Sequence, residues 1–476
     1  MKTKRINQIS ADTNLTRSEI KKIIEKTNTA VEVKPEYLSL TDWEFYGSML
    51  QIEYEQCIDE GLEIEEYKDL FDAVHKLPKN EIKKRFADII FDIVRSANVK
   101  KDYPYLEPSD LESIRALRKP YSYEKKNGAS LEDRVHGAWQ GRVCGCMLGK
   151  TVEGVRRDKL VPFLKETSNY PMHRYILESD MTEEIKAKYV TNPWYADTID
   201  GMPVDDDTNY TVLYQQIINE YGRTFSPWDV SRAWIRFQQK GAYCTAERKA
   251  FCNFVAGYCP PESATYQNAF REWIGAQIRA DYFGYINPGD PETAAEMAWR
   301  DASISHVKNG IYGEMFAAAM IAVAAETDDE ADIIRAGLAQ VPCTSRLYAG
   351  VTSVLDGFEN GVTEEECFNN IHEKYDEHTE HGWCHTIPNA MIVAAALLYG
   401  KGDFGRSICM SVENGFDTDC NGATVGSILG MAKGIAGIDK CWTDPIGDKL
   451  NTSIFGVGTV KISDRARMTM EHINGK

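Results

Sequence analysis

The stretch GFDTDCNGATVGSILG, residues 415–430, decides how the rest of the chain is interpreted. A regular glycine series begins in it and runs past its end, at Gly422, Gly426, Gly430 and Gly434. Residues four apart lie on the same face of an α-helix. The spacing therefore predicts a buried helix with one face of nearly bare backbone, against which a second element can pack closely.

Two carboxylates, Asp417 and Asp419, stand at the start of this predicted helix. Helix N-termini favour anions, so one interpretation is simple capping by an aspartate or by Thr418. The other is an oxygen-rich pocket for a hard divalent cation such as Mg²⁺ or Mn²⁺. The stretch alone leaves both interpretations open.

A second acidic motif, VDDDTNY, occupies residues 204–210. Apolar residues at helical spacing follow it as far as Tyr221, and Gly222 then ends the predicted helix. One cap needs one aspartate, and adjacent carboxylates repel unless a cation or solvent relieves them. The motif contains three consecutive acids, Asp205, Asp206 and Asp207. Together with Asp417 and Asp419 they would place five carboxylates at two helix starts, enough to balance two divalent ions.

The segment LEDRVHGAWQGRVCGCMLGKTVEG, residues 131–154, carries small residues at roughly four-residue spacing. It predicts a second closely packing helix that ends in a turn with Glu153 beside Gly154. A lone glutamate is more often a solvated surface acid. Its position after a tightly packed helix makes Glu153 a candidate for a site.

Composition narrows the class of protein. The 476 residues include 43% hydrophobic residues and carry a net charge of −18, which argues against a general nucleic-acid surface. The twelve cysteines form no C-x-x-C pair and are interpreted as buried, reduced thiols. The N-terminus MKTKRINQIS has no apolar core, and no apolar run is long enough to span a bilayer. A cytoplasmic enzyme without a membrane partner is expected.

The chain is expected to be all-α and to divide into two parts. Residues 1–130 predict a helical extension and linker, with helices in 14–27, 40–61 and 81–97 that pack on the main domain or on a second subunit. The third helix places Phe86, Ile89, Ile90 and Ile93 on one face. Residues 131–476 predict one compact multi-helix domain, because helical periodicities recur without strand alternation.

Five motifs in order, GRVCGCMLGKTVEG, VDDDTNY, GAQIRAD, ASISH and GFDTDCNGATVGSILG, resemble the ADP-ribosylglycohydrolase (DraG-like) family. The resemblance implies an all-helical hydrolase with a binuclear centre of Mg²⁺ or Mn²⁺. By this resemblance, the metal-ligating aspartates are Asp206, Asp207, Asp417 and Asp419, and the glutamate near the scissile bond is Glu153. The segment that lines the ADP-ribose diphosphate site contains Gly275, Ala276 and Arg279, and a further substrate-pocket segment contains His306.

Three further residues, Trp383, His385 and Asn389, precede an apolar helix and are candidates for the substrate pocket, although core packing also accounts for the tryptophan. Arg279 and Asp281 precede a Pro/Gly-rich turn, so their segment predicts a loop that lines a cleft. Arg279 is a candidate phosphate clamp, with a surface ion pair as the alternative. His306 has a second interpretation as a hydrogen-bonded core residue.

Three residues depart from the family pattern. Asp205 stands where many members have Thr or Ser, Cys420 where many use a Thr hydroxyl as a ligand, and Cys146 where an Asp is usual. We count Asp205 and Cys420 among the candidate ligands, although a thiol is a poor ligand for Mg²⁺. The departures suggest a divergent branch whose substrate need not be an ADP-ribosylated protein.

The expected reaction is hydrolysis of the glycosidic bond of an ADP-ribosyl or related ribosyl conjugate, small or macromolecular. Bond cleavage develops an oxocarbenium-like ribose, and the resemblance nominates Glu153, Asp206 and Asp417 as catalytic residues. The alternatives are a hydrolase of nucleosides or other N-glycosides, and a non-catalytic nucleotide-binding or structural descendant. A homo-oligomer is possible, and the sequence identifies neither the leaving group nor the metal.

Overall fold

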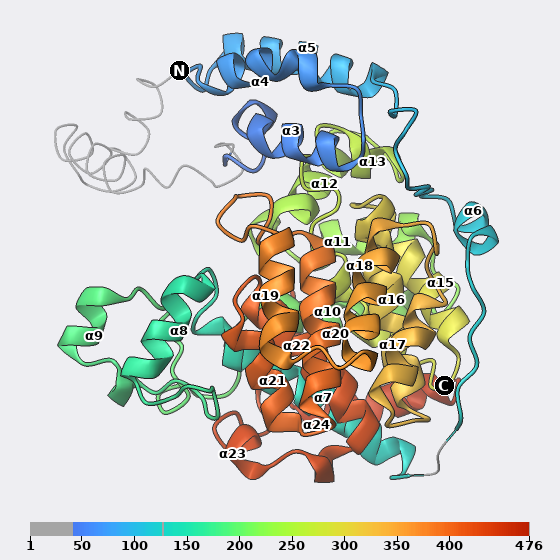
Figure 1. Cartoon of the computed structure of the whole chain (residues 1–476). Coiled ribbons are helices and arrows are strands. Elements are labelled where there is room, and N and C mark those ends of the chain that lie inside the picture. Colours follow the sequence, from blue (N-terminus) through green and yellow to red (C-terminus); the bar gives the residue numbers. More distant parts are fainter. Residues whose placement is uncertain (1–40, 126–127, 476) are drawn as a thin grey trace, which may run out of the picture.

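The computed structural model describes residues 41–125 and 128–475, and these form an all-α structure (Figure 1). The predicted fold class is confirmed. The only strands in the described part are β1 (Leu450–Asn451) and β2 (Thr459–Val460), which pair antiparallel. The helix expected in residues 14–27 lies outside the described residues.

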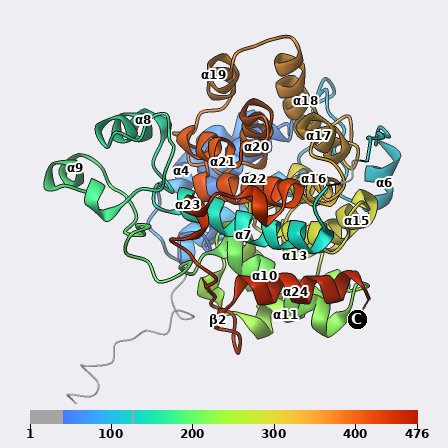
Figure 2. The ribbon, with the colours of Figure 1, turned by 90° about the horizontal axis from the view of Figure 1, so that it is seen from below.

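Two glycine-rich helices, α7 (Leu131–Lys150) and α22 (Thr418–Lys433), pack against each other at the centre. Figure 2 shows them side by side, with α10 and α24 on one side and α20 and α21 on the other. A Cβ atom built on Gly145 would lie 1.9 Å from the carbonyl oxygen of Gly422, and one on Gly141 would lie 2.2 Å from that of Gly426. No side chain fits between the two backbones, so the glycine spacing permits the contact.

The remaining helices of the main domain surround this pair. Two of them, α16 and α20, are apolar and almost entirely buried. The bounds of all these surrounding helices are α8 Arg157–Glu166, α9 Glu183–Lys188, α10 Asp206–Tyr221, α11 Pro227–Phe237, α12 Thr245–Val255, α13 Glu262–Thr265, α14 Asp281–Tyr285, α15 Pro291–Ala302, α16 Lys308–Ala324, α17 Glu330–Leu338, α18 Arg346–Glu359, α19 Glu364–Lys374, α20 Thr386–Gly400, α21 Phe404–Glu413, α23 Lys440–Thr443 and α24 Ile462–Ile473. Short 3-10 helices span Tyr46–Ser48, Glu65–Tyr67, Glu178–Asp180, Lys240–Ala242, Gln277–Arg279 and Ile435–Gly437.

One local expectation was wrong. The segment around Arg279 was interpreted as a loop lining a cleft. It forms instead a 3-10 helix followed by the short helix α14, and both Arg279 and Asp281 are buried. Arg142 on α7 binds Asp281 (2.7 Å between Nη1 and Oδ2), which ties this segment to the central helices.

Among the described residues before 130, α3 (Leu50–Asp59), α4 (Lys68–His75) and α5 (Glu81–Ser96) lie on top of the main domain in Figure 1, and α6 (Leu111–Ala116) lies at its right side. Within α5 the expected apolar face is only partly correct. Ile90 is buried, but Phe86 and Ile89 are 44% and 53% exposed. Ala87 and Phe91 face the small core of this unit instead.

Buried ion pairs join these helices to the main domain. Glu53 and Glu60 of the N-terminal helices both bind Arg271 (2.8 and 2.6 Å). Gln56 donates a hydrogen bond to Glu272 (2.7 Å). The helices are therefore fixed to one face of the domain, while the division into 1–130 and 131–476 stays a prediction.

Candidate metal and hydrolytic centre

Six carboxylates from three parts of the chain gather where α7 ends and α10 and α22 begin. We call this group the acidic centre. The antiparallel contact of α7 with α22 brings the end of the first helix to the start of the second, and Thr418 Oγ1 donates a hydrogen bond to the carbonyl of Gly149 (3.0 Å). The members are Glu153, Asp205, Asp206, Asp207, Asp417 and Asp419.

A strained turn orients Asp417. Gly415 and Phe416 both have positive φ (76° and 55°), a conformation that costs energy for a phenylalanine. The carboxylate of Glu377 accepts the backbone N–H of Phe416 (2.8 Å), and the side-chain oxygen of Asn389 accepts that of Asp417 (3.1 Å). The surrounding structure thus holds the turn in the form that Asp417 requires.

Capping explains only part of the acidic residues. Asp205 caps α10, since its side chain accepts the N–H of Asp207 (2.9 Å), and it also binds Lys150 (2.7 Å). Asp417 occupies the N-cap position of α22, but its side chain accepts no N–H of that helix. Capping therefore does not account for Asp206, Asp207 or Asp417.

The donors suit a divalent cation. Ligand atoms of Asp207, Asp419 and Cys420 all lie within 4.8 Å of one another, and those of Cys146, Asp205 and Asp207 do as well. Asp207 is fully buried; its Oδ1 binds Arg142 (3.1 Å), while its Oδ2 has no hydrogen-bond partner among the described residues. A buried, unpaired carboxylate oxygen is costly unless a cation or another partner meets it.

Repulsion within the acidic centre appears in the pKa values. Loss of hydration, followed by the charges of Asp417, Asp205 and Asp206, raises the pKa of Glu153 to about 8, although this residue stays accessible to solvent. Burial and Asp205 raise the pKa of Asp206 to about 7. The side chains therefore hold protons that a cation would replace.

Three thiols lie in contact with this centre. Cys146 and Cys420 belong to the two groups of potential ligands above. Cys384, which sequence reasoning did not single out, donates a hydrogen bond to Oδ2 of Asp417 (3.1 Å). Burial raises the pKa of all three thiols, so they are neutral without a metal.

The residues expected to bind substrate are not all at the acidic centre. Arg279 is fully buried and binds Asp301 (2.6 Å), Glu247 (2.9 Å) and Glu314 (3.4 Å), so its guanidinium is already engaged by carboxylates. Gly275 packs on the same Glu247, 2.0 Å from the position of a Cβ, and its neighbour Ala276 is buried. These residues are buried, and Glu247, their neighbour, is close enough to Asp206 that its charge, after burial and Asp205, raises the pKa of that aspartate.

His306 lies elsewhere, in the buried turn between α15 and α16, where its Nδ1 meets Ser305 Oγ (2.8 Å). It borders a hollow that also includes Trp228 and Trp299. Trp383, by contrast, lies beside the acidic centre. The guanidinium of Arg156 sits over its ring, 4.4 Å from the centroid, and its carbonyl accepts a hydrogen bond from Asn389 (3.0 Å).

His385 belongs to a separate cluster with His381 and Asp59, whose ligand atoms are also close enough for a metal. However, Nδ1 of His385 accepts the N–H of Ile387 (3.2 Å), and Nδ1 of His381 accepts the indole N–H of Trp273 (3.2 Å). Each neutral ring then carries its proton on Nε2, the atom that faces the carboxylate. Nε2 of His381 lies 3.1 Å from Oδ2 of Asp59, so this pair connects α3 to the core. Nε2 of His385 has no hydrogen-bond partner among the described residues.

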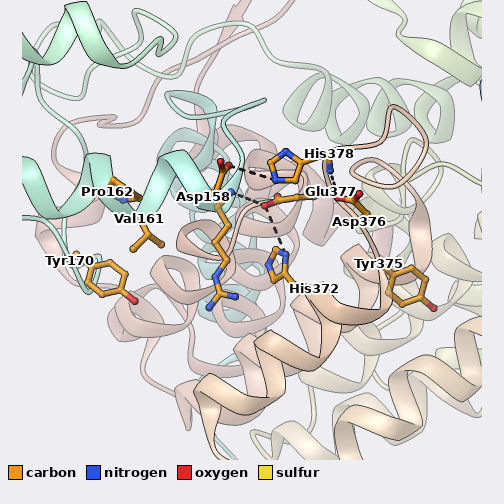
Figure 3. Close-up of a pocket in the computed structure, with 10 residues that line it drawn as sticks. Asp158, Val161, Pro162, Tyr170, His372, Tyr375, Asp376, Glu377 and His378 are labelled. Atoms are coloured by element: carbon orange, nitrogen blue, oxygen red, sulfur yellow. Dashed lines mark hydrogen bonds and ion pairs between the residues drawn. The ribbon is translucent and has the colours of Figure 1, made fainter.

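A hollow of about 520 Å³ is lined by residues of α8 and by the end of α19 with the segment that follows it, including Glu377 (Figure 3). Figure 3 shows Glu377 next to His372, and Asp158 next to His378. Glu377 accepts the backbone N–H of Arg157 as well as that of Phe416, so it ties the start of α8 to the turn. Because Glu153 precedes α8 by a few residues, this carboxylate also fixes the loop that carries Glu153.

The family profile described as ADP-ribosylglycohydrolase matches residues 127–469. The chain belongs to the ADP-ribosylglycohydrolase family. Membership supports hydrolase activity of the glycosidase type. The matched region contains the whole acidic centre and excludes α3–α6.

Among solved structures, one described as an ADP-ribosylglycohydrolase-related protein complex is similar, with 14% identity and a TM-score of 0.43; the match covers 72% of this chain and 98% of that one. The search of curated proteins found no match. Within the described residues, no helix combines the length and apolar character needed to cross a membrane.

Proposed function

We propose that this protein uses divalent metal ions to hydrolyse the glycosidic bond of an ADP-ribosyl or related ribosyl conjugate. One observation carries the proposal. The fold joins two acidic motifs about 210 positions apart into a single group with Glu153, and one oxygen of the buried Asp207 has no partner among the described residues. Family membership supplies the reaction class.

The candidate ligands for two ions, Mg²⁺ or Mn²⁺, are Asp205, Asp206, Asp207, Asp417, Asp419 and Cys420. When bound, such ions supply positive charge that orients ribose hydroxyls and acidifies a water molecule. Lys150 and Arg142 neutralise only Asp205 and Asp207. The four remaining carboxylates, Glu153, Asp206, Asp417 and Asp419, carry the charge that two divalent ions would balance. A carboxylate oxygen close to the anomeric carbon would stabilise an oxocarbenium-like ribose.

Glu153 is the proposed general base. It has solvent access and is surrounded by the other acids, which raise its pKa. Once these like charges are balanced, the carboxylate is available near neutral pH to take the proton of the attacking water. The water oxygen bonds to the anomeric carbon as the glycosidic bond breaks, and the leaving group takes up a proton. Asp206 or Asp417 is the alternative base.

A substrate screen tests this function. ADP-ribosylated arginine, other ADP-ribosyl conjugates and simple nucleosides are incubated with Mg²⁺, with Mn²⁺ and with a chelator. Chelator-sensitive release of ADP-ribose from a conjugate is expected. Turnover of nucleosides alone would favour the N-glycoside hydrolase alternative. The absence of turnover and of metal binding would favour a non-catalytic descendant.

A further inference from the structure

A cavity of about 470 Å³ lies between the N-terminal helices and the main domain. Its size falls in the range of small-molecule pockets, about 300–1,000 Å³. One wall comes from residues before the region that matches the family, and the other from inside that region. The first includes Asp42, Trp43, Met49 and Ile52, and the second Thr245, Phe270, Trp273 and Trp383.

The cavity adjoins the acidic centre through Trp383. The next residue, Cys384, donates its thiol hydrogen bond to Asp417 (3.1 Å). Asn389 donates to the carbonyl of Trp383 (3.0 Å) and accepts the backbone N–H of Asp417 (3.1 Å). The position of the tryptophan is therefore coupled to that of a candidate metal ligand through two short links.

A positively charged side chain, Arg156, lies near both Trp383 and Asp417. The guanidinium of Arg156 covers the ring of Trp383 and is close enough to Asp417 to be affected by its charge. Its Nη1 is buried and has no hydrogen-bond partner among the described residues. An arginine with an unused donor suits an anionic group such as a phosphate.

The cavity walls are aromatic on both sides. Trp43 is 39% exposed, with the guanidinium of Arg248 over its ring at 5.1 Å, and Trp383 is half-buried. Solvent-accessible tryptophan rings stack well with planar heteroaromatic groups, since every nucleobase has a π-face.

We infer that the N-terminal helices complete the substrate site, and that this cavity holds the heteroaromatic base of a nucleotide whose ribose lies at the acidic centre. Trp43 and Trp383 contact the base, and Arg156 faces the phosphates between base and ribose. The inference rests on the proposed function and adds that residues outside the family region determine which ligand binds.

Calorimetric titration with ADP-ribose and with ribose 5-phosphate, both in Mg²⁺, tests the inference. The second ligand lacks the base. Trp43→Ala should weaken ADP-ribose binding by about tenfold, the loss expected for one stacked base, and leave ribose 5-phosphate binding unchanged. Trp43→Phe should retain most of the affinity. The control is Trp228→Ala, which removes a tryptophan that is 47% exposed and borders a different hollow.

Each contrary outcome has a distinct meaning. Unchanged ADP-ribose affinity in a folded Trp43→Ala variant would overturn the base site while leaving the proposed function intact. Equal weakening of both ligands, or a loss also seen with Trp228→Ala, would indicate a general structural effect and overturn it too. If neither ligand binds the parent protein with Mg²⁺ or Mn²⁺, the proposed function fails and the base site fails with it.

Discussion

Gly145 of α7 and Gly422 of α22 are in backbone contact, since a Cβ on Gly145 would lie 1.9 Å from the carbonyl oxygen of Gly422. The contact sets the spacing of the two helices that carry the acidic centre. Glu153 and Asp417 are 264 positions apart in the chain (417 − 153) and meet only because these helices touch. The geometry of the acidic centre therefore depends on two glycines, Gly145 and Gly422, which have no functional side chain.

Gly145→Ala should destabilise the protein by about 3 kcal/mol, because the added methyl group meets rigid backbone and forces the helices apart. Urea unfolding measures the change. The control is Gly357→Ala in α18, where the nearest atom to the new Cβ lies at 3.6 Å. That variant should be neutral or gain up to about 1 kcal/mol, as expected for alanine in a helix. Equal stability of the two variants would contradict the close packing.

Glu153→Gln should leave folding and metal binding nearly intact and lower kcat by about 10²-fold or more, since a neutral amide cannot take a proton from water. Initial rates on the substrate found by the screen measure this. Glu112→Gln, at an exposed position of α6, is the matched control and should keep full activity. Near-normal turnover by Glu153→Gln would move the role of base to an aspartate.

Cys420→Thr should keep or improve activity with Mg²⁺, because a hydroxyl is a harder ligand than a thiol at the same position. Melting curves at increasing Mg²⁺ report affinity independently of turnover. The exposed Cys441 provides the control substitution to threonine, which should change neither measurement. If a folded Cys420→Thr protein loses activity, the thiol has a role of its own.

The sequence predicted the elements of this centre better than their surroundings. Glycine spacing, helical periodicity and adjacent acids are local signals, so α7, α10, α22 and the turn at Glu153 could be predicted. The packing of α7 on α22 joins residues far apart in the chain, and neither pattern alone identifies its partner. The whole acidic centre depends on that pairing.

Local patterns gave less information about charged residues that are satisfied at long range. Arg279 looked available for a phosphate, whereas three carboxylates from other elements surround it. Glu377, which holds the turn before Asp417, belongs to no motif, and Asn389 was expected in the substrate pocket whereas it accepts the backbone N–H of Asp417. A signal existed for Arg142, an arginine among the small residues of α7, whose burial demands a carboxylate partner.

The stability of the metal-free protein should fall as pH rises. The folded-state pKa values of Glu153 and Asp206, about 8 and about 7, are raised above the ordinary values of 4.5 and 3.8. Stabilisation from the bound protons is complete below the ordinary values and is lost as pH rises through about 7 to 8. In a chelator, Tm should therefore decrease over this range. Asp206→Asn should reduce the decrease, and a Tm independent of pH would contradict the crowding of charges.

The central claim is that the two acidic motifs form one metal centre, and a thermal-shift titration tests it most directly. Mg²⁺ and Mn²⁺ are added to the parent, Asp206→Asn, Asp417→Asn and the double variant. One shared centre predicts a metal-induced rise in Tm that each single substitution largely abolishes, with little further loss in the double variant. A parent protein insensitive to both metals, or losses of about 0.5–2 kcal/mol that add and do not depend on metal, as for two independent helix caps, would contradict it.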